Sequence, residues 1–310
     1  MTGRANLQVF ADTVLQLARM DGNVLVVTSD SRGSGKLVEF GRQCPGQIVE
    51  VGIAEQNLVG IAAGLASVGK TVYAVSPASF LTARALEQIK NDVCYSDRPV
   101  NLIGISAGVS YGALGSTHHS LHDVAALRAL HNIVILAPAD NFETAEAVRQ
   151  AASLSKPVYI RLGKRPMEPL HKAGTRFRIG KAIQLRRGQD LVFFASGETV
   201  ARAADAADQL ARDGINAGVL SFHTLKPLDQ EAIRREARRC GAVITVEEHS
   251  VCGGLGEACA AVLLEAGVGA RFKIIGLPDE ETVTGSQLEI YDHYGISVRG
   301  LAGTARRLLG

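Results

Sequence analysis

The sequence contains no tryptophan, few other aromatic residues and only five cysteines among its 310 residues. The cysteines are odd in number and show no paired spacing, so they indicate buried, reduced thiols and argue against a disulfide framework. They are Cys44, Cys94, Cys240, Cys252 and Cys259. Hydrophobic residues make up 46% of the chain, which is enough for sizeable cores, and the usual length per domain predicts two domains.

The sequence also lacks a long apolar run and a strong charge of either sign. No stretch is apolar for long enough to span a bilayer, and the segment Met1–Met20 has an amphipathic pattern without the apolar centre of a secretory signal. A net charge of +2 provides no broad basic field for nucleic acid. We therefore expect a globular, cytoplasmic protein with no membrane or nucleic-acid partner.

Short runs rich in β-branched residues alternate with helical stretches along the first half of the chain. This alternation predicts an α/β fold, with a mainly parallel sheet covered by helices on both faces. The expected strands are Val24–Ser29, Ile48–Val51, Val72–Ser76, Val100–Ser106, Ile133–Ala137 and Val158–Arg161.

A second α/β unit follows a segment that we interpret as an interdomain linker. Gly163–Thr175 contains two prolines, two glycines and a cluster of basic residues, with little apolar periodicity. We place the domains at residues 1–165 and 181–310, with residues 166–180 as the linker. Expected strands are Asp190–Ser196, Ile215–Ser221, Ala242–Glu247 and Phe272–Leu277, and expected helices are Val200–Arg212 and Asp229–Arg239, the latter capped by Asp229.

Two glycine-containing loops have only a superficial likeness to nucleotide sites. In Thr28–Lys36, Asp30 stands where a Walker-type loop has its first glycine, and Leu37 stands where the magnesium-binding hydroxyl is required. Gly253–Gly256 lacks the spacing of a dinucleotide loop. Neither loop predicts a nucleotide site.

Glu55 is the most informative residue of the sequence, because it lies between an apolar strand and a helix of small residues, in Val51–Gly60 (VGIAEQNLVG). A plain interpretation is an acidic residue favoured by the dipole at the start of a helix. However, this run and the following Ala62–Ala66 resemble the pyrimidine-binding domain of thiamine diphosphate enzymes of the transketolase family. The segment Val246–Gly256 resembles the C-terminal domain of the same family, so the resemblance covers essentially the whole chain.

The resemblance implies a cofactor role for three residues. Glu55 is expected to hydrogen-bond the N1′ nitrogen of the aminopyrimidine, which favours the imino tautomer that activates the thiazolium carbon. Phe80 is expected to stack on the pyrimidine ring, with an ordinary core position as the alternative, and a helix from Thr82 to Val93 is expected after it. Asp30 matches an acid that lies beside the cofactor at the end of the first strand.

The resemblance also implies contacts with a phosphorylated sugar. His118, in the loop Gly112–Asp123, takes the place of a substrate-contacting histidine that donates hydrogen bonds and moves protons. Ser34 matches a hydroxyl near the substrate phosphate. Arg161, at the end of the sixth strand, matches an arginine that binds this phosphate, with a surface ion pair as the alternative. Arg84 is expected either at a phosphate or in a pair with Glu87 or with the neighbours of Glu55.

Two further features of the His118 loop bear on its chemistry. His118 and His122 are four residues apart, a spacing that suits zinc on one helical face, although no glutamate follows the first histidine and no third ligand is near. We therefore expect no metal site. Leu114 stands where family transketolases carry an acid that reads the hydroxyl configuration of the donor sugar, so an unusual donor is expected.

The sequence has no counterpart of one essential family motif. The diphosphate is held through a divalent metal by a Gly-Asp-Gly motif and a later asparagine, and Asp21-Gly22-Asn23 is the nearest match without fulfilling it. The resemblance thus implies a separate diphosphate-binding subunit that carries the Mg²⁺ ligands, in a complex with two copies of each chain. The expected reaction is transfer of a two-carbon ketol unit between sugar phosphates.

Two alternatives remain open at this stage. The segment Phe80–Ala85 is also similar to that of deoxyxylulose phosphate synthase, which makes a synthase-like or 2-oxo acid decarboxylating subunit a rival. A non-catalytic assembly or regulatory subunit is the rival from another class. The effect of Glu55→Gln on the activity of the complex distinguishes a catalytic subunit from such a subunit.

Overall fold

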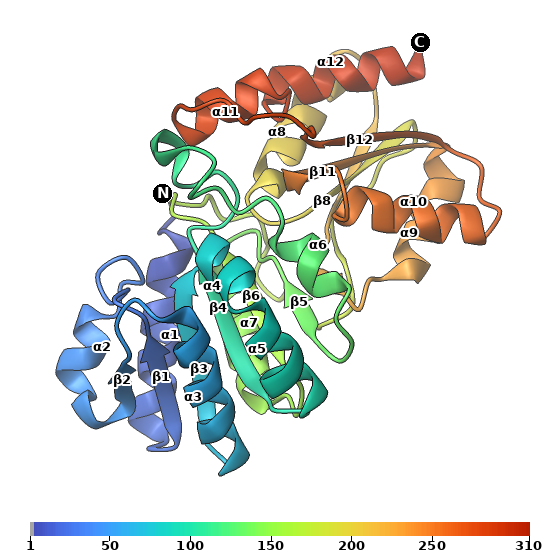
Figure 1. The fold of residues 1–310 in the computed structure, drawn as a ribbon. Coiled ribbons are helices and arrows are strands. Elements are labelled where there is room, and N and C mark those ends of the chain that lie inside the picture. Colours follow the sequence, from blue (N-terminus) through green and yellow to red (C-terminus); the bar gives the residue numbers. More distant parts are fainter. Residues whose placement is uncertain (1–2) are drawn as a thin grey trace.

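The computed structural model describes residues 3–310, which form two α/β units (Figure 1). The first unit contains α1 (Asn6–Met20), β1 (Val24–Thr28), α2 (Val38–Gln43), η1 (Pro45–Gln47), β2 (Ile48–Glu50), α3 (Glu55–Ser67), β3 (Thr71–Pro77), α4 (Ala78–Arg84), α5 (Leu86–Gln88), the π-helix η2 (Ile89–Tyr95), β4 (Val100–Ile105), η3 (Gly112–Leu114), α6 (Asp123–Arg128), β5 (Val134–Leu136), α7 (Asn141–Ser153) and β6 (Val158–Leu162).

The second unit begins with an edge strand and ends with two helices. It contains β7 (Ile183–Arg186), β8 (Leu191–Ala195), α8 (Thr199–Arg212), β9 (Ala217–Ser221), β10 (Thr224–Lys226), α9 (Gln230–Cys240), β11 (Ala242–Ser250), α10 (Leu255–Glu265), β12 (Arg271–Leu277), α11 (Gln287–His293) and α12 (Val298–Leu309). No named helix or strand lies between β6 and β7, where the linker was expected.

Both sheets are mainly parallel, as the sequence predicted. The first has the order β10-β5-β6-β4-β3-β1-β2 and the second β12-β11-β8-β9-β7. In the first sheet only β10 is antiparallel, and in the second only β7. Because parallel strands end at one edge, the loops after β1, β3, β4 and β6 meet at the carboxyl edge of the first sheet.

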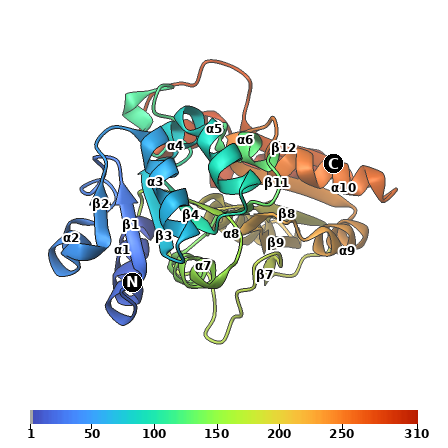
Figure 2. The same ribbon diagram turned by 60° about the horizontal axis from the view of Figure 1, so that its bottom comes forward.

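Helices cover both faces of each sheet. On the first sheet, α3 packs with Leu58 and Ala62 on one face, while α1 and α7 pack with Phe10 and Val148 on the other (Figures 1 and 2). On the second sheet, α8 and α12 lie on one face and α9 and α10 on the other. Successive side chains of a strand point to opposite faces of the sheet, so Val27 packs into the core on one face and Val26 into the core on the other.

The structure corrects three details of the sequence-based prediction. Strand β10 comes from the second half of the chain but pairs with β5 of the first sheet, so the segment expected in the second domain completes the first sheet. The single helix expected from Thr82 to Val93 is divided into α4, α5 and a π-helical segment. Four cysteines are buried as expected, but Cys252 is exposed.

None of the helices among the described residues has the length and apolar character needed to cross a membrane.

Asp229 caps α9 as predicted and also ties the helix to the residue that precedes β7. Its Oδ1 accepts from the amide of Ala232 at 3.2 Å, and its Oδ2 accepts from the amide of Ala182 at 3.0 Å. A carboxylate at this position satisfies one of the orphan amides of the first helical turn.

We expect Asp229→Ala to lower the free energy of unfolding by about 1–2 kcal/mol, because both amides lose their acceptor. Asp229→Asn keeps an oxygen acceptor, so its loss is expected to be smaller. Urea denaturation measures both, with Asp279→Ala at an exposed position as the control. Equal stability of the alanine variant and the wild type would contradict the capping role.

Candidate active site at the carboxyl edge of the first sheet

Glu55 is the first residue of α3 and its carboxylate is buried, with 2% of the side chain exposed. The chain enters the helix through Gly52, whose φ of +72° is a backbone conformation that disfavours a side chain. The Glu55 Oε1 accepts a long hydrogen bond from the Ser76 hydroxyl at 3.5 Å, and Ser29 donates to Ser76 at 2.8 Å. Two adjacent strands, β1 and β3, therefore help to place this carboxylate.

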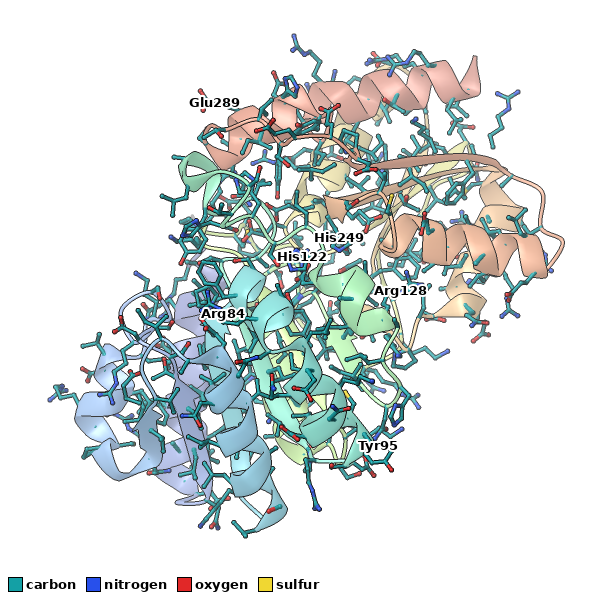
Figure 3. All side chains as sticks on the ribbon, in the orientation of Figure 1. Arg84, Tyr95, His122, Arg128, His249 and Glu289 are labelled. Carbon is teal, nitrogen blue, oxygen red and sulfur yellow. The ribbon has the colours of Figure 1, made fainter. Side chains whose placement is uncertain are left out.

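Arg84 is the charged partner of Glu55. Its Nη1 donates to Glu55 Oε2, while 47% of its own side chain stays exposed. Figure 3 shows Arg84 on α4. An opposite charge offsets the cost of burying a carboxylate. The ion pair expected for Arg84 was with Glu87 or with the neighbours of Glu55, whereas the structure shows the pair with Glu55 itself.

A wall of rings continues from Arg84 along the same edge. The Arg84 guanidinium lies 5.2 Å from the centre of the Phe80 ring, and Phe80 lies edge-on to His118 at 5.3 Å between ring centres. His118 in turn lies edge-on to Tyr111 at 5.5 Å. Lys164, which follows β6, places its amine 4.3 Å from the centre of the Tyr111 ring. We call Phe80, His118 and Tyr111 the ring wall.

The position of Phe80 differs from an ordinary core position. It lies on α4, after the end of β3, and it is only partly buried. The ring is therefore not enclosed in the core.

The zinc alternative for His118 and His122 fails on local geometry. The segment between them is not helical and contains Ser120 in an isolated bridge to Gly108, and α6 begins only at Asp123, so the two histidines do not share a helical face. His118 Nδ1 is 2.9 Å from the Thr117 hydroxyl, whereas His122 Nε2 is 3.3 Å from the Thr82 hydroxyl. Within residues 3–310, no group of three or more histidine, cysteine or acidic side chains is arranged to hold a metal.

Asp30 and Ser34 lie in the loop after β1, at the same edge as Glu55. Asp30 is exposed with a φ of +51°, and its amide donates to Glu50 at 2.7 Å. Ser34 is partly buried, and its hydroxyl donates to the carbonyl of Ser31 at 3.3 Å. Both residues therefore lie at the expected edge, although neither makes a hydrogen bond with Glu55.

Arg161 does not present a free guanidinium at this edge. Only 7% of its side chain is exposed, and its Nε donates to the fully buried Asp123 at 2.9 Å. Its Nη2 donates to the carbonyls of Ser120 and Glu248 at 3.3 and 3.2 Å. The guanidinium of Arg161 is therefore not open to a substrate phosphate in this structure. The alternative expectation was an ion pair on the surface, but the ion pair that the structure shows is buried.

Asp123 is held in its charged form by this arrangement. Burial alone raises the pKa of Asp123, but the charge of Arg161, the neighbouring His249 and the hydrogen bonds from Tyr159 and Arg161 outweigh it, so that its pKa lies below the usual value. The Tyr159 hydroxyl donates to Asp123 at 2.7 Å. Because Arg161 also contacts the carbonyl of Glu248, the pair joins the two units.

The glycine-rich segment of the second unit binds a carboxylate of its own chain. Glu247 accepts from the amides of Leu255 and Gly256 at 2.6 and 2.8 Å, at the start of α10. Burial raises the pKa of Glu247 to about 7, in opposition to these hydrogen bonds. Glu247, Glu248 and His249 are all buried.

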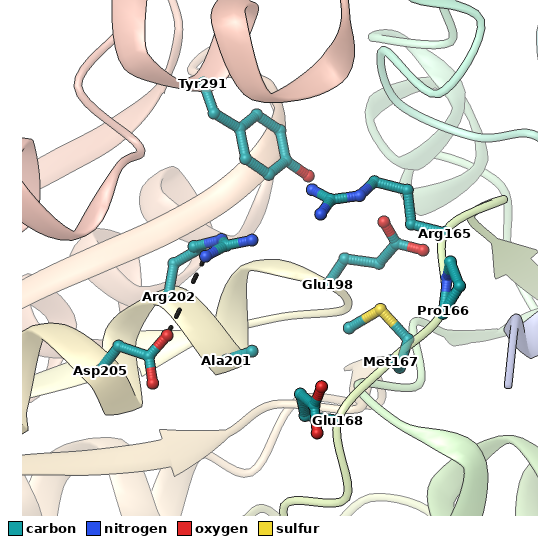
Figure 4. Close-up of a pocket in the computed structure, with 9 residues that line it drawn as sticks. All are labelled: Arg165, Pro166, Met167, Glu168, Glu198, Ala201, Arg202, Asp205 and Tyr291. Atoms are coloured by element: carbon teal, nitrogen blue, oxygen red, sulfur yellow. Dashed lines mark ion pairs between the residues drawn. The ribbon is translucent and has the colours of Figure 1, made fainter. Parts of the chain in front are cut away.

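A separate cavity of about 250 Å³ lies between the units, beside Arg165, Glu198, Arg202 and Tyr291 (Figure 4). Gln287 bridges two buried carboxyl groups next to it, donating to Glu198 at 3.0 Å and to Glu248 at 2.7 Å. Burial, followed by the charge of Glu248, raises the pKa of Glu198 to about 8. Glu198 packs on Gly163, where a Cβ would lie 1.8 Å from Glu198 Oε1.

Comparison with known proteins agrees with this geometry. Residues 3–168 match the family model for the transketolase pyrimidine-binding domain, and residues 180–301 match the model for the transketolase C-terminal domain. The chain belongs to the transketolase family. Its two α/β units are therefore the pyrimidine-binding and C-terminal domains of a transketolase.

Full-length relatives place the chain more narrowly within the transketolases. An apulose-4-phosphate transketolase subunit of Phocaeicola vulgatus is 46% identical over 297 residues, which cover 96% of this chain and 95% of the relative. The 6-deoxy-6-sulfo-D-fructose transketolase subunit SqwH of a Clostridium species is 36% identical over 278 residues, covering 87% and 86%. A solved split-gene transketolase, described as an inactive beta4 tetramer, superposes with a TM-score of 0.88 at 34% identity, covering 99% and 98%.

These matches show that the chain is the second subunit of a split transketolase. The chain is also 37% identical over 303 residues to the 1-deoxy-D-xylulose-5-phosphate synthase of Heliobacterium modesticaldum, but it spans only 46% of that protein. The subunit interpretation therefore rests on relatives that the chain matches almost from end to end.

The residues at the carboxyl edge of the first sheet fit the aminopyrimidine of thiamine diphosphate. Glu55 offers a buried carboxylate, Phe80 a partly exposed ring and Ser79 a buried hydroxyl that has no hydrogen-bond partner among the described residues. A buried polar group without a partner is costly, so the unpaired hydroxyl of Ser79, the residue before Phe80, suits a ligand with ring nitrogens.

Three residues of the site escaped the sequence-based prediction. Tyr111 and Lys164 extend the ring wall, and Asp123 binds Arg161. Neither Tyr111 nor Lys164 belongs to a recognisable motif. Asp123 ends the quoted loop Gly112–Asp123, but the identity of its partner depends on the pairing of β4 with β6, which local sequence does not show.

We expect Arg161→Met to lower the free energy of unfolding by about 3–5 kcal/mol, because it leaves the Asp123 charge buried without its partner. The double variant Arg161→Met with Asp123→Leu removes both charges and is expected to regain much of this loss. Guanidinium denaturation measures both variants. A loss below about 1 kcal/mol in the single variant would contradict a buried pair.

We also expect the free energy of unfolding to fall as pH rises from 4.5 to about 8, the range over which the raised pKa of Glu198 acts. Because its pKa is raised from 4.5 to about 8, the folded protein binds the proton more tightly than the unfolded chain. This contribution is complete below pH 4.5 and is lost by about pH 8, with a slope of at most about 1.4 kcal/mol per pH unit.

Denaturation at pH 7 and pH 9 measures this effect above the range of His249, whose pKa burial lowers to about 4. The slope is expected to be flatter in Glu198→Gln, which keeps an acceptor for Gln287, and unchanged in the exposed control Glu265→Gln. The same slope in wild type and Glu198→Gln would show that Glu198 does not bind the extra proton.

Proposed function

We propose that this chain supplies the pyrimidine side of a thiamine diphosphate site and that Glu55 binds the N1′ nitrogen of the cofactor. The observation that carries the proposal is a buried carboxylate at the head of α3, next to the partly exposed Phe80 ring. Thiamine diphosphate, when bound, supplies the electron sink for carbon–carbon bond cleavage and formation.

The chain's own residues then have distinct roles. Glu55 holds a proton at N1′, and Ser76 and Arg84 orient and stabilise its carboxylate. Phe80 packs against the pyrimidine ring, and Asp30 lies beside the cofactor. His118 donates to a hydroxyl of the sugar and moves protons there, with Ser34 and Arg84 nearer the substrate than Arg161.

The substrates that we propose are sugar phosphates, between which a two-carbon ketol unit is transferred. Two relatives support this class, since one is named for apulose 4-phosphate and another for a sulfo-sugar. Leu114 is 54% exposed and places an apolar side chain where an acid was expected. A donor whose hydroxyl configuration is not read by an acid agrees with this replacement.

We propose that a separate diphosphate-binding subunit completes the site. It would carry the Mg²⁺ ligands, in a cytoplasmic complex with two copies of each chain. The relatives that this chain matches end to end are named as subunits, which supports a divided enzyme.

Glu55→Gln tests the proposed function in the reconstituted complex. We expect kcat to fall by about 10²–10⁴-fold with assembly unchanged, because an amide cannot hold the proton at N1′. Glu87→Gln, an exposed position on α5, is the matched control. Size-exclusion chromatography checks assembly. An unchanged kcat in Glu55→Gln would instead support a non-catalytic assembly or regulatory subunit.

The synthase-like alternative has a separate signature. A 37% identical synthase favours it, and such an enzyme releases carbon dioxide from a 2-oxo acid, whereas ketol transfer between sugars does not. Release of carbon dioxide by the reconstituted complex at the rate of product formation would therefore replace the transketolase proposal.

A further inference from the structure

The loop that carries Tyr111 and His118 is closed at its base by a short backbone bridge. The amide of Ser120 donates to the carbonyl of Gly108 at 2.8 Å, and these two residues form an isolated antiparallel bridge. Residues 109–119 lie between them and include η3. Because both ends of the loop meet at this bridge, the place of the bridge decides where the two rings lie.

Glu248 of the second unit holds this base. It lies on β11 and is only 5% exposed, and its Oε1 accepts from the amide of Val109 at 2.9 Å. Gly108 packs on the same carboxyl group with a φ of +63°, and a Cβ there would lie 2.2 Å from Glu248 Cδ. Glycine is the residue that allows so close an approach in this backbone conformation, so the base of the loop is fitted to the carboxyl group.

The second unit also holds the loop at other points. The side chain of Val109 is fully buried in the core of the second unit, and the amide of Ser250 donates to the carbonyl of Leu121 at 3.1 Å. A Cβ at Gly112 would lie 2.2 Å from the carbonyl oxygen of Gly285, so η3 packs against the segment before α11 (Figures 1 and 2). The loop belongs to the first unit in sequence, but it is anchored in the second.

Glu248 is itself held by a buried amide. Gln287 Nε2 donates to Glu248 Oε1 at 2.7 Å and to Glu198 Oε2 at 3.0 Å. Burial raises the pKa of Glu248, in opposition to the charge of Arg161 and to the hydrogen bonds from Gln287 and from the Val109 amide. What the loop takes from Glu248 is an oxygen acceptor at a fixed place, and a neutral amide of the same shape also supplies one.

We propose that Glu248 is a positioning residue of the transfer reaction, because it fixes the base of the loop that places His118 against the sugar substrate. The proposal rests on the proposed function, which assigns His118 to a sugar hydroxyl. Glu248 is buried and acts through the Val109 amide. A displacement of about 1 Å at a reacting group lowers a rate by about 10²-fold, so one hydrogen bond at the base of the loop has a large effect on turnover.

Glu248→Met tests this role in the reconstituted complex, since methionine has a similar length and is a poor acceptor. We expect kcat/KM to fall about 10–100-fold. Glu248→Gln keeps an oxygen for the Val109 amide, so it is expected to stay within about threefold of the wild type. A Glu248→Gln variant as impaired as Glu248→Met would overturn the proposal.

Glu247→Met is the matched control. Glu247 is the neighbouring buried glutamate and also accepts from backbone amides, but these are the amides of Leu255 and Gly256 at the start of α10. Its replacement is expected to lower the free energy of unfolding and to leave kcat/KM within about threefold of the wild type.

A double-mutant cycle shows whether Glu248 acts through His118. If it does, Glu248→Met lowers kcat/KM much less in a His118→Ala background than in the wild type, because the group that it positions is already absent. An equal loss from Glu248→Met in the two backgrounds would contradict the positioning role and would indicate a merely structural one.

Hydrogen exchange of the full chain tests the position of the loop without turnover. We expect the amides of residues 109–119 to exchange at least about tenfold faster in Glu248→Met than in the wild type or in Glu248→Gln, with α3 unchanged. In Glu247→Met the faster exchange is expected at the start of α10 instead. If Glu248→Met does not fold, Gly108→Ala replaces it, because the added Cβ displaces the Glu248 carboxyl group.

The exchange result stays separable from the proposed function. If the wild-type complex transfers no ketol unit, the proposed function fails, and faster exchange confined to the loop still shows that Glu248 positions it. Equal exchange of the loop in Glu248→Met and the wild type would overturn the proposal, whatever the activity of the complex.

Discussion

The burial of the Glu55 carboxylate is the constraint on which the rest of the site depends. A carboxylate with 2% exposure is stable only if partners replace its water, and here these partners are the Ser76 hydroxyl and the Arg84 guanidinium. Ser76 comes from the end of β3 and Arg84 from the helix that follows it. The position of one acidic side chain thus fixes how β3, α3 and α4 meet.

A second buried ion pair, between Arg161 and Asp123, anchors the loop that carries Tyr111 and His118. Arg161 and Asp123 hold the start of α6 against β6, and the amide of Val109 donates to Glu248 of the second unit at 2.9 Å. Tyr111 and His118 lie between these two anchors. The C-terminal domain therefore contributes to the site indirectly, by holding both ends of the loop that carries Tyr111 and His118.

Features with a local physical cause were predictable from the sequence. The strands follow from β-branched runs, the cap of α9 from Asp229, and the position of Glu55 from the change between an apolar strand and a helix of small residues. The chemistry expected of Glu55 came from the family resemblance, because periodicity alone does not predict it. The relatives confirm the family and the split-subunit assignment.

Features that depend on long-range pairing were not predictable. Strand β10 has three residues and joins the sheet of the other unit, so no local pattern marks it. Arg161 was expected at a substrate phosphate because of its place at a strand end, but that place says nothing of Asp123, 38 residues away. Lys164 follows the same strand, and its contact with the Tyr111 ring could not be predicted because the two residues belong to different loops.

The central claim is that this chain holds one end of thiamine diphosphate and depends on a partner for the other. Calorimetric titration of thiamine diphosphate with Mg²⁺ tests it most directly, first into this chain alone and then into its mixture with the diphosphate-binding subunit. Weak binding to the chain alone and tight, Mg²⁺-dependent binding to the mixture are predicted. Tight, Mg²⁺-dependent binding to the chain alone would contradict the claim.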